Sequence, residues 1–272
     1  MRGRGRGVNR AGAKYARGVA WRAAAGAIDS ARICAMCIAH LKQLCDRIAM
    51  TDTTLARPDY AAMRHAMVVS QLRTSAVSDP RIVAAMGEVP RETFVPSAQS
   101  ALAYRDVALP LAGGRAINAP LITGRLLVAA EILPTDRVLI VGAAMGYAAV
   151  VAARIAASVV ALEEDATLVE GARAAIADAK VTVVEGPLVQ GWAAGAPYDA
   201  IVIDGAIDSV PDAIVAQLAP GGRLATGLID RGVTRLALGR RTEGGFGLAD
   251  FADMDCVTLP GFARPKTFQF TR

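Results

Sequence analysis

The sequence predicts an α/β domain over residues 50–272, in which a mostly parallel sheet carries helices on both faces. After Pro120, short apolar segments alternate with longer segments of helical periodicity. The apolar segments are nearly continuous rather than alternating, which is typical of parallel strands buried on both faces. A glycine-containing turn also follows the first of these strands, as it does in sheets that bind nucleotides.

The segment before Pro120 is expected to be helical. Tyr60–Arg73 carries apolar residues at helical spacing, among them Met63, Met67, Val68 and Leu72. Ser78-Asp79-Pro80 is a typical helix start, because it offers a capping oxygen and then a proline where no amide hydrogen is needed. The helix that it begins, Arg81–Glu88, is expected to end before Pro90.

Beyond Pro120 the predicted elements alternate along the chain. Strands are expected at Arg137–Val141, Ser158–Leu162, Val181–Glu185, Ala200–Ile203 and Gly222–Gly227. Helices are expected at Tyr147–Ala156, Ala166–Ala179 and Asp212–Leu218. Residues 233–272 read as shorter strands and turns that form an antiparallel edge of the sheet.

Residues 1–49 differ from the rest in charge and composition. They hold 10 of the 30 basic and 2 of the 25 acidic residues, a net charge of +8, which leaves −3 for residues 50–272. The main domain therefore gives no electrostatic reason to expect a nucleic-acid partner. The start is low in complexity, and the whole segment is interpreted as a basic tail, disordered or helical in part.

Apolar residues and cysteines at helical spacing favour a helix over Ser30–Ile48 within this tail. The same residues include Cys34, Cys37, His40 and Cys45, which are zinc-ligand types, although the spacing is short and no glycine turns the chain. Two further alternatives stay open: Met50 is the true start, or the arginine-rich segment is an organelle transit peptide.

The remaining composition points to a protein of the cytoplasm without a membrane partner. The sequence has no run of 18 uncharged apolar residues, and Cys256 is the single cysteine of residues 50–272. A disulfide framework is therefore not expected, which suits a reducing compartment. The sequence does not indicate an oligomeric state.

A cofactor site is predicted where the first two strands of the main domain end. Gly142 permits a tight turn after the first strand, and Gly146 lets the following helix pack close to it. Glu163 ends the second strand, where an acidic side chain can accept both ribose hydroxyls of an adenosine cofactor. Gly142, Ala144, Gly146 and Glu163 are therefore expected to form a Rossmann-like cofactor site.

Two alternatives to this site stay open. The glycines can be ordinary turn residues, with Glu163 a solvated strand end. The cofactor can also be NAD(P), against which three features count. The turn lacks the middle glycine that lets backbone approach a pyrophosphate. About 70 helical residues precede the first strand, and the sequence offers no Tyr-x3-Lys pair or placed histidine for hydride chemistry.

Several short motifs, in order, resemble the protein-L-isoaspartate O-methyltransferase family. Val89–Pro96 reads Val-Pro-Arg-Glu-Thr-Phe-Val-Pro, and Ala103–Asp106 reads Ala-Tyr-Arg-Asp. Gly114–Pro120 stands where the family has Gly-x-Thr-Ile-Ser-x-Pro, and Gly191-Trp192 follows later. The resemblance runs from about Met67 to Gly227, and the departures below place the chain in a divergent bacterial paralogue group.

The resemblance implies a methyltransferase that uses S-adenosylmethionine to methylate isoaspartyl carboxylates in proteins or peptides, a step in protein repair. It places Asn118 at the family's active-site serine, and Gly186 in the Gly-Asp pair that contacts adenine. Ile117 and Asp204 are expected in the substrate pocket. The departures are Asn118 itself, Ala116 for threonine, Ile140 for an acid, Ala144-Met145 for Gly-Ser and Pro187 for aspartate.

Three functions remain open on these grounds. The first is methylation of isoaspartyl peptides, whose carboxylate is already ionised at pH 7 and needs no general base. The second is a methyltransferase of the same fold with another acceptor, because Asp204 would repel a carboxylate unless it is paired, for example with Arg115. The third is a non-catalytic paralogue that binds the cofactor weakly. A loop-capping role for Asp204 is an equally open alternative.

Overall fold

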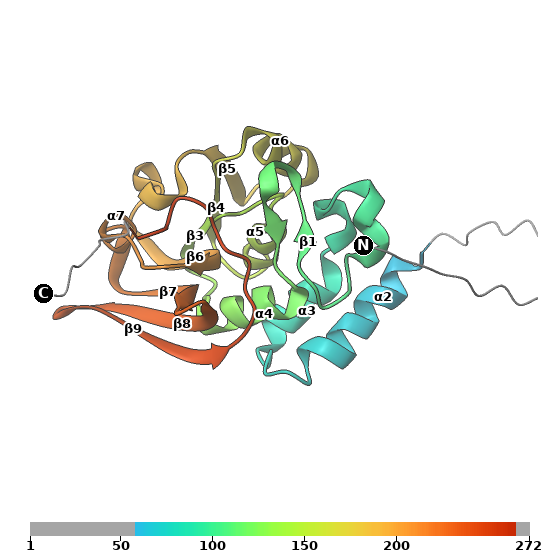
Figure 1. The fold of residues 1–272 in the computed structure, drawn as a ribbon, viewed down its shortest axis with the longest axis horizontal. Helices are drawn as coiled ribbons and strands as arrows, with labels where there is room; N and C mark the ends of the chain where they lie inside the picture. Colours follow the sequence, from blue (N-terminus) through green and yellow to red (C-terminus); the bar gives the residue numbers. More distant parts are fainter. Residues whose placement is uncertain (1–57, 265–272) are drawn as a thin grey trace, which may run out of the picture. The chain divides into compact units, whose positions relative to one another are not determined.

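A computed structural model describes residues 58–264 of the chain, and the predicted tail features lie outside the described residues. The described part begins with α2 (Tyr60–Met67), capped by the Asp59 side chain, and continues into a π-helical turn, η1 (Val68–Leu72). The π turn divides the single helix that was expected over Tyr60–Arg73. Helix α3 (Pro80–Glu88) starts as predicted, with the Asp79 carboxylate accepting from the Arg81 amide. Helix α3 packs against α4 (Pro120–Ala129) and α5 (Tyr147–Ala153) (Figure 1).

A seven-stranded sheet forms the centre, in the order β5-β4-β3-β6-β7-β8-β9. Its five parallel strands are β3 (Arg137–Val141), β4 (Ser158–Glu163), β5 (Val181–Glu185), β6 (Tyr198–Ile207) and β7 (Leu218–Asp230). The chain moves outward from β3 through β4 to β5, and then returns to the other side of β3 to form β6 and β7. This reversal lies between β3 and β6, which is where ligands bind in doubly wound sheets.

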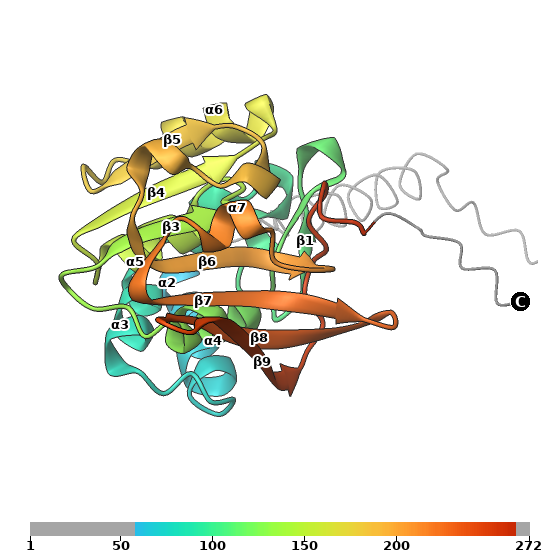
Figure 2. The same cartoon turned by 90° about the vertical axis from the view of Figure 1, so that its left-hand side faces the viewer.

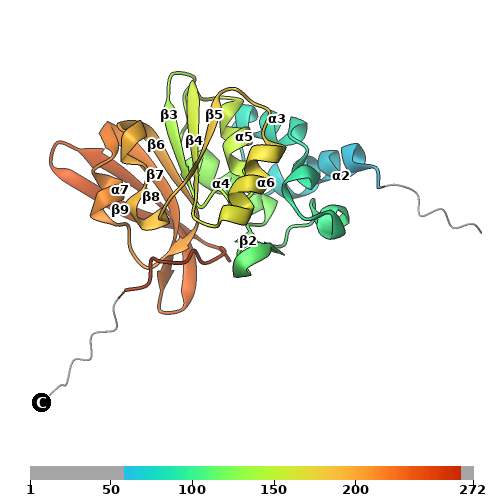
Figure 3. The ribbon, with the colours of Figure 1, turned by 90° about the horizontal axis from the view of Figure 1, so that it is seen from above.

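Helices cover both faces of the sheet, which confirms the predicted α/β class. Figure 3 shows strands β3 to β7 between α4, α5 and α6 (Ala166–Ala175) on one side and the short α7 (Asp212–Val215) on the other. The core is divided accordingly, because Ile140 and Val138 face one buried cluster while Leu139 and Val141 face the other. This alternation within one buried strand explains why the strand sequence is apolar throughout.

The last two strands form the antiparallel edge that was expected. Strands β8 (Val233–Thr242) and β9 (Gly245–Asp253) form a hairpin beside β7 and are longer than predicted. Several other bounds also differ. The helix expected over Ala166–Ala179 ends at Ala175, because Ile176 leaves helical geometry and packs against Gly146. Strand β6 extends past the predicted Ile203, since a register shift lets Ala206 pair with Gly227.

Shorter elements complete the fold: η2 (Arg91–Phe94), η3 (Ser97–Leu102), β1 (Leu109–Pro110), η4 (Ala112–Gly114), β2 (Ala116–Ile117), η5 (Leu188–Gln190) and η6 (Ala193–Gly195). Strands β1 and β2 pair antiparallel. Figure 2 shows β1 on the side toward which the arrows of the central strands point. No helix in residues 58–264 is long and apolar enough to cross a membrane.

Candidate active site

Strand register places three predicted residues in one row at the carboxyl edge of the sheet. Val141 of β3 pairs with Leu162 of β4 and with Ile203 of β6. The next residues along these strands are Gly142, Glu163 and Asp204. The glycine therefore lies between two acidic residues at the point where the strand order reverses.

The turn after β3 has the backbone geometry that its glycines predict. Gly142 and Gly146 have φ angles of +75° and +96°, a region that side chains disfavour. Ala144 also has a positive φ, +51°, and its amide donates to Glu163 Oε2 at 2.8 Å. The turn and the acid thus form one unit, with the backbone N–H pointing at the carboxylate.

Glu163 is fully buried, and both of its carboxylate oxygens accept hydrogen bonds. Its Oε1 accepts from the amides of Glu164 and Asp165 at 2.9 and 3.2 Å. The same oxygen lies 2.6 Å from Arg115 Nη1 in a buried ion pair. A buried carboxylate requires such partners, because an unpaired charge in the protein interior is costly. The open alternative that Glu163 is a solvated strand end does not describe this structure.

A loop of the chain, Leu111–Asn118, lies over this row and is called the crevice loop here. It includes the β1–β2 turn, where Gly113 and Gly114 adopt φ angles of +63° and +73°. A methyl group on Gly113 would collide with the Asp165 carboxylate, so the loop approaches the end of β4 closely. Arg115 follows and pairs with Glu163 rather than with Asp204, the partner considered from sequence.

Asn118 uses its whole side-chain amide in contacts within the chain. Nδ2 donates to the backbone oxygen and to Oδ1 of Asp204, at 3.1 and 2.8 Å. Oδ1 accepts from the Val257 amide at 2.9 Å and from the Cys256 thiol at 3.4 Å. With two donors and two acceptor sites engaged, the amide holds the crevice loop, β6 and the C-terminal segment together. A direct contact of Asn118 with an acceptor stays a prediction.

Asp204 is a buried carboxyl group in a mixed environment. Burial raises its pKa, which the hydrogen bond from Asn118 and the charge of Arg91 partly offset. Thr123 Oγ1 lies 3.4 Å from Oδ1, and the charge of Arg115 also lowers the pKa. Asp204 therefore serves as a structural partner of Asn118 while it stands in the row beside Gly142.

Arg91 lies in the Val89–Pro96 segment that resembles the family, and it bonds to the end of the crevice loop. Its Nε donates to the Ala103 carbonyl at 2.8 Å, and its Nη2 donates to the Asn118 carbonyl. The guanidinium carbon lies 4.6 Å from the Tyr147 ring centre, a cation–π geometry. Burial lowers the pKa of Arg91 and raises that of Tyr147 to about 12. Sequence reasoning quoted Arg91 as a motif residue but gave it no role.

The C-terminal segment is a second part of the site that sequence reasoning missed. A methyl on Gly142 would lie 2.9 Å from both methyl groups of Leu259, and Leu259 also lies against Gly205. Leu259 is 3% exposed and its amide donates to the Ala206 carbonyl at 3.0 Å. The sequence predicts edge strands and turns for residues 233–272. It contains no motif near Leu259 that indicates a contact with Gly142.

The remaining expected residues lie near the row in different ways. Ile117 is buried on β2, one residue before Asn118. Gly186 follows β5, and its amide donates to the Glu163 carbonyl at 3.1 Å. Their contacts with ligands stay predictions. The Cys34–Cys45 zinc reading lies outside the described residues, and within 58–264 no cluster of three or more His, Cys, Asp or Glu side chains could hold a metal.

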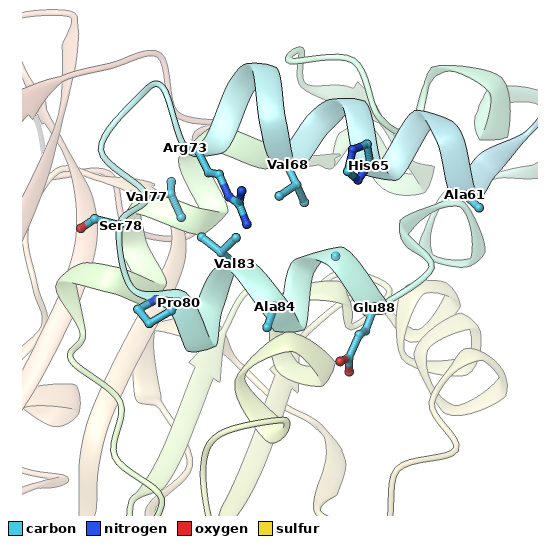
Figure 4. Close-up of a pocket in the computed structure, with 11 residues that line it drawn as sticks. Ala61, His65, Val68, Arg73, Val77, Ser78, Pro80, Val83, Ala84 and Glu88 are labelled. Carbon is cyan, nitrogen blue, oxygen red and sulfur yellow. The ribbon is translucent and has the colours of Figure 1, made fainter.

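A separate hollow of about 550 Å³ lies between the first helices (Figure 4). Val68 and Val83 line it from η1 and α3, and His65, Arg73 and Glu88 stand at its polar parts. It is formed by helices and contains neither the glycine turn nor the acids of the row. The chemistry of the site is therefore assigned to the strand ends rather than to this hollow.

Comparison with known proteins identifies the family. The family model of protein-L-isoaspartate(D-aspartate) O-methyltransferase (PCMT) matches residues 63–255. The chain belongs to this family. It is 42% identical over 205 residues to a protein-L-isoaspartate O-methyltransferase of Methylorubrum extorquens (strain PA1), covering 74% of this chain and 90% of that one. A relative from Methylorubrum populi is 40% identical over 213 residues, covering 77% and 96%.

Solved structures of the family share the fold of this chain. A protein-L-isoaspartate O-methyltransferase structure superposes with a TM-score of 0.64 at 24% identity, covering 73% of this chain and 66% of the other. A second has a TM-score of 0.61 at 19% identity and covers 74% and 98%; it comes from Plasmodium falciparum and contains S-adenosyl-L-homocysteine. The family model and the Methylorubrum relatives confirm the resemblance noted from sequence, and the two solved structures show the same fold.

Proposed function

We propose that this chain transfers a methyl group from S-adenosylmethionine to the free carboxylate of isoaspartyl residues in proteins or peptides. The observation that carries the proposal is the buried Glu163 carboxylate at the end of β4, bonded to the amide of Ala144 in the glycine turn. This is the arrangement in which an acid accepts the ribose hydroxyls of an adenosine cofactor. Family membership and the names of the relatives support the reaction and its substrate class.

The residues of the row fit such a cofactor in composition. Glu163 would hold the ribose, and Gly142, Ala144 and Gly146 would face the rest of the molecule with backbone instead of side chains. At Gly142 an added methyl would meet Leu259 and Arg115, so the turn has space for backbone alone. Gly186, after β5, is the residue that would approach the adenine. When bound, the cofactor supplies an electrophilic methyl group on a sulfonium.

The chain then has little proton chemistry to perform. A free carboxylate has a pKa near 4 and is ionised at pH 7, so it attacks the methyl carbon without a base. The protein's part is to align the acceptor oxygen and to exclude water, since proximity and orientation alone lower such barriers substantially. Asn118 suits this part as a positioning residue, because its bonds to Asp204 and Val257 fix the crevice loop.

A second candidate is a methyltransferase with a different acceptor. It is favoured by the carboxylate of Asp204, which stands beside Gly142 and would repel another carboxylate. The non-catalytic alternative draws on the altered turn residues Ala144 and Met145.

For the main proposal we place the reaction in the cytoplasm, in keeping with the free thiol of Cys256.

The test is methanol release after incubation of the native chain with methyl-labelled S-adenosylmethionine and an isoaspartyl peptide. We expect slow but measurable release, and none from the matched peptide that carries an ordinary aspartyl residue. Binding of S-adenosylhomocysteine without any methanol release would contradict the isoaspartyl acceptor and favour the second candidate. Weak or absent cofactor binding without methanol release would favour the non-catalytic one.

Asn118→Ser restores the family's residue and tests its role in the same assay. Because both amide atoms of Asn118 already bond within the chain, we expect the rate to change by less than about tenfold, or about 1.4 kcal/mol. A thermal melt of the variant controls for the lost hydrogen bonds. A fall in rate of a hundredfold or more in a folded variant would assign Asn118 a direct role in the reaction.

A further inference from the structure

Arg115 forms an ion pair with Glu163, the residue whose carboxylate is expected to bind the ribose of the cofactor. Its Nη1 lies 2.6 Å from Glu163 Oε1, and the two residues are 7% and 0% exposed. Glu163 Oε1 also accepts from two backbone amides, so its capacity is used while Arg115 is in place. A ribose that bonds to Oε1 must therefore replace Arg115 as its partner.

The second terminal nitrogen of Arg115 has no partner among the described residues. Nη2 is buried and makes no hydrogen bond there. It lies over the glycine turn, 3.5 Å from where a Gly142 methyl would stand. The guanidinium thus extends from Glu163 across the middle of the row, toward the side where Asp204 lies.

The guanidinium of Arg115 is the positive charge between two acidic residues of the row. Glu163 and Asp204 flank Gly142, and both are acidic residues below 10% exposure. A carboxylate acceptor entering here would meet repulsion unless a cation stood between it and the acids. The charge of Arg115 already acts on Asp204, and a guanidinium binds a carboxylate through two parallel hydrogen bonds.

We propose that Arg115 exchanges partners during binding: it pairs with Glu163 before the cofactor arrives, and then binds the carboxylate of the acceptor. This inference rests on the proposed function, because it takes an isoaspartyl carboxylate as the acceptor. Asn118 anchors the end of the crevice loop, whereas Gly113 and Gly114 precede Arg115 with positive φ angles, so the backbone on this side of Arg115 can change its conformation. The exchange couples the two ligands, so that each strengthens the binding of the other by the same factor.

The first experiment measures S-adenosylhomocysteine binding by calorimetry to the native chain and to Arg115→Gln. Removing the cation that competes for Glu163 should increase the affinity for S-adenosylhomocysteine by about tenfold or more, because the Arg115–Glu163 ion pair no longer has to break. Arg240→Gln is the matched control, because Arg240 pairs with Glu131 at the same 2.6 Å but on β8, half-exposed. Unchanged or weaker binding by Arg115→Gln would overturn the proposal.

The second experiment uses the unaltered chain, so that it does not depend on the folding of a variant. The affinity of a fluorescent isoaspartyl peptide is measured with and without saturating S-adenosylhomocysteine. We expect affinity about tenfold or more higher with the cofactor product present. Equal affinity in the two conditions would overturn the exchange of partners.

The third arm repeats the peptide measurement with S-adenosylhomocysteine bound to the variants. Arg115→Gln should lose about tenfold or more in peptide affinity, and Arg115→Lys should recover part of it by keeping the charge. Native methanol release with tighter peptide binding by Arg115→Gln would overturn this inference and leave the proposed function standing. A native chain that binds S-adenosylhomocysteine but no isoaspartyl peptide would overturn the acceptor role and the proposed function together.

Discussion

Asp204 is a buried residue whose ionisation is disfavoured by its surroundings. It accepts from Asn118 and Thr123, and burial raises its pKa from the ordinary value of 3.8. In the unfolded chain the same carboxyl group is in water and loses its proton more readily. Between about pH 4 and the raised pKa of the native state, Asp204 therefore binds more protons in the folded chain than in the unfolded chain, and stability falls as the pH rises through this range.

Asp204→Asn tests this sign, because the amide keeps the shape and cannot ionise. We expect the melting temperature of the variant, relative to the native chain, to increase as the pH rises above about 4, and to become constant once Asp204 of the native chain has ionised. Val69→Ala, an exposed change at a side chain that does not ionise, is the control and should give a constant difference. A relative melting temperature that fell with rising pH would show that Asp204 is stabilised as an anion.

Among single residues of the site, the sequence could predict those whose position follows from spacing along the chain. Gly142 and Glu163 were found from a strand, a turn and an acid at the expected separation, since each lies at the end of its own strand. Arg115 was considered as a partner of Asp204, but its pairing with Glu163 was not predicted, because that contact joins residues 48 positions apart and depends on how the crevice loop folds back. The role of Leu259 was missed for the same reason.

The turn from β3 to α5 shows how one element depends on a glycine. Gly146 caps α5 in left-handed geometry, and a methyl there would collide with Ile176 and approach Ala172 of α6. Ile176 and Ala172 can approach the start of α5 this closely because Gly146 has no side chain. The element therefore couples the cofactor turn to the packing of two helices.

Gly146→Ala should lower the free energy of unfolding by about 2–4 kcal/mol, combining left-handed strain with overpacking. Gly232→Ala is the matched control, since its φ is +82° but an added methyl meets nothing within 4 Å. It should cost about 1–2 kcal/mol, the strain alone. Chemical denaturation gives both values, and equal losses would show that the contact with Ile176 relaxes freely.

The bounds of the elements were predicted best where a capping residue or proline defines them, and worst where tertiary contacts do. Helix α3 begins at Pro80 after Asp79, as the sequence indicates. Helix α6 ends four residues early, although Ala177 and Ala179 favour helix, because Ile176 is needed against Gly146. Strand β6 passes through Gly205 because pairing with β7 continues beyond it.

For the whole molecule, the family match and the row of acids both lie within the described residues. Residues 1–49 carry a net charge of +8 and little aromatic mass, so the sequence predicts that they add little to the stability of the rest. A chain that begins at Met50 should melt within a few degrees of the full chain. A larger drop would indicate docking of the Ser30–Ile48 helix, and about one zinc per full-length chain would revive the metal reading.

Helix α5 has a consequence for how the molecule opens. All seven of its residues, Tyr-Ala-Ala-Val-Val-Ala-Ala, are buried between the sheet and the other helices. No side of this helix faces solvent, so its backbone amides are protected from exchange by local opening. They are expected to exchange with deuterium only when the whole molecule unfolds. The slowest-exchanging amides of the chain should accordingly lie directly behind the cofactor turn, and their exchange rate measures the free energy of global opening.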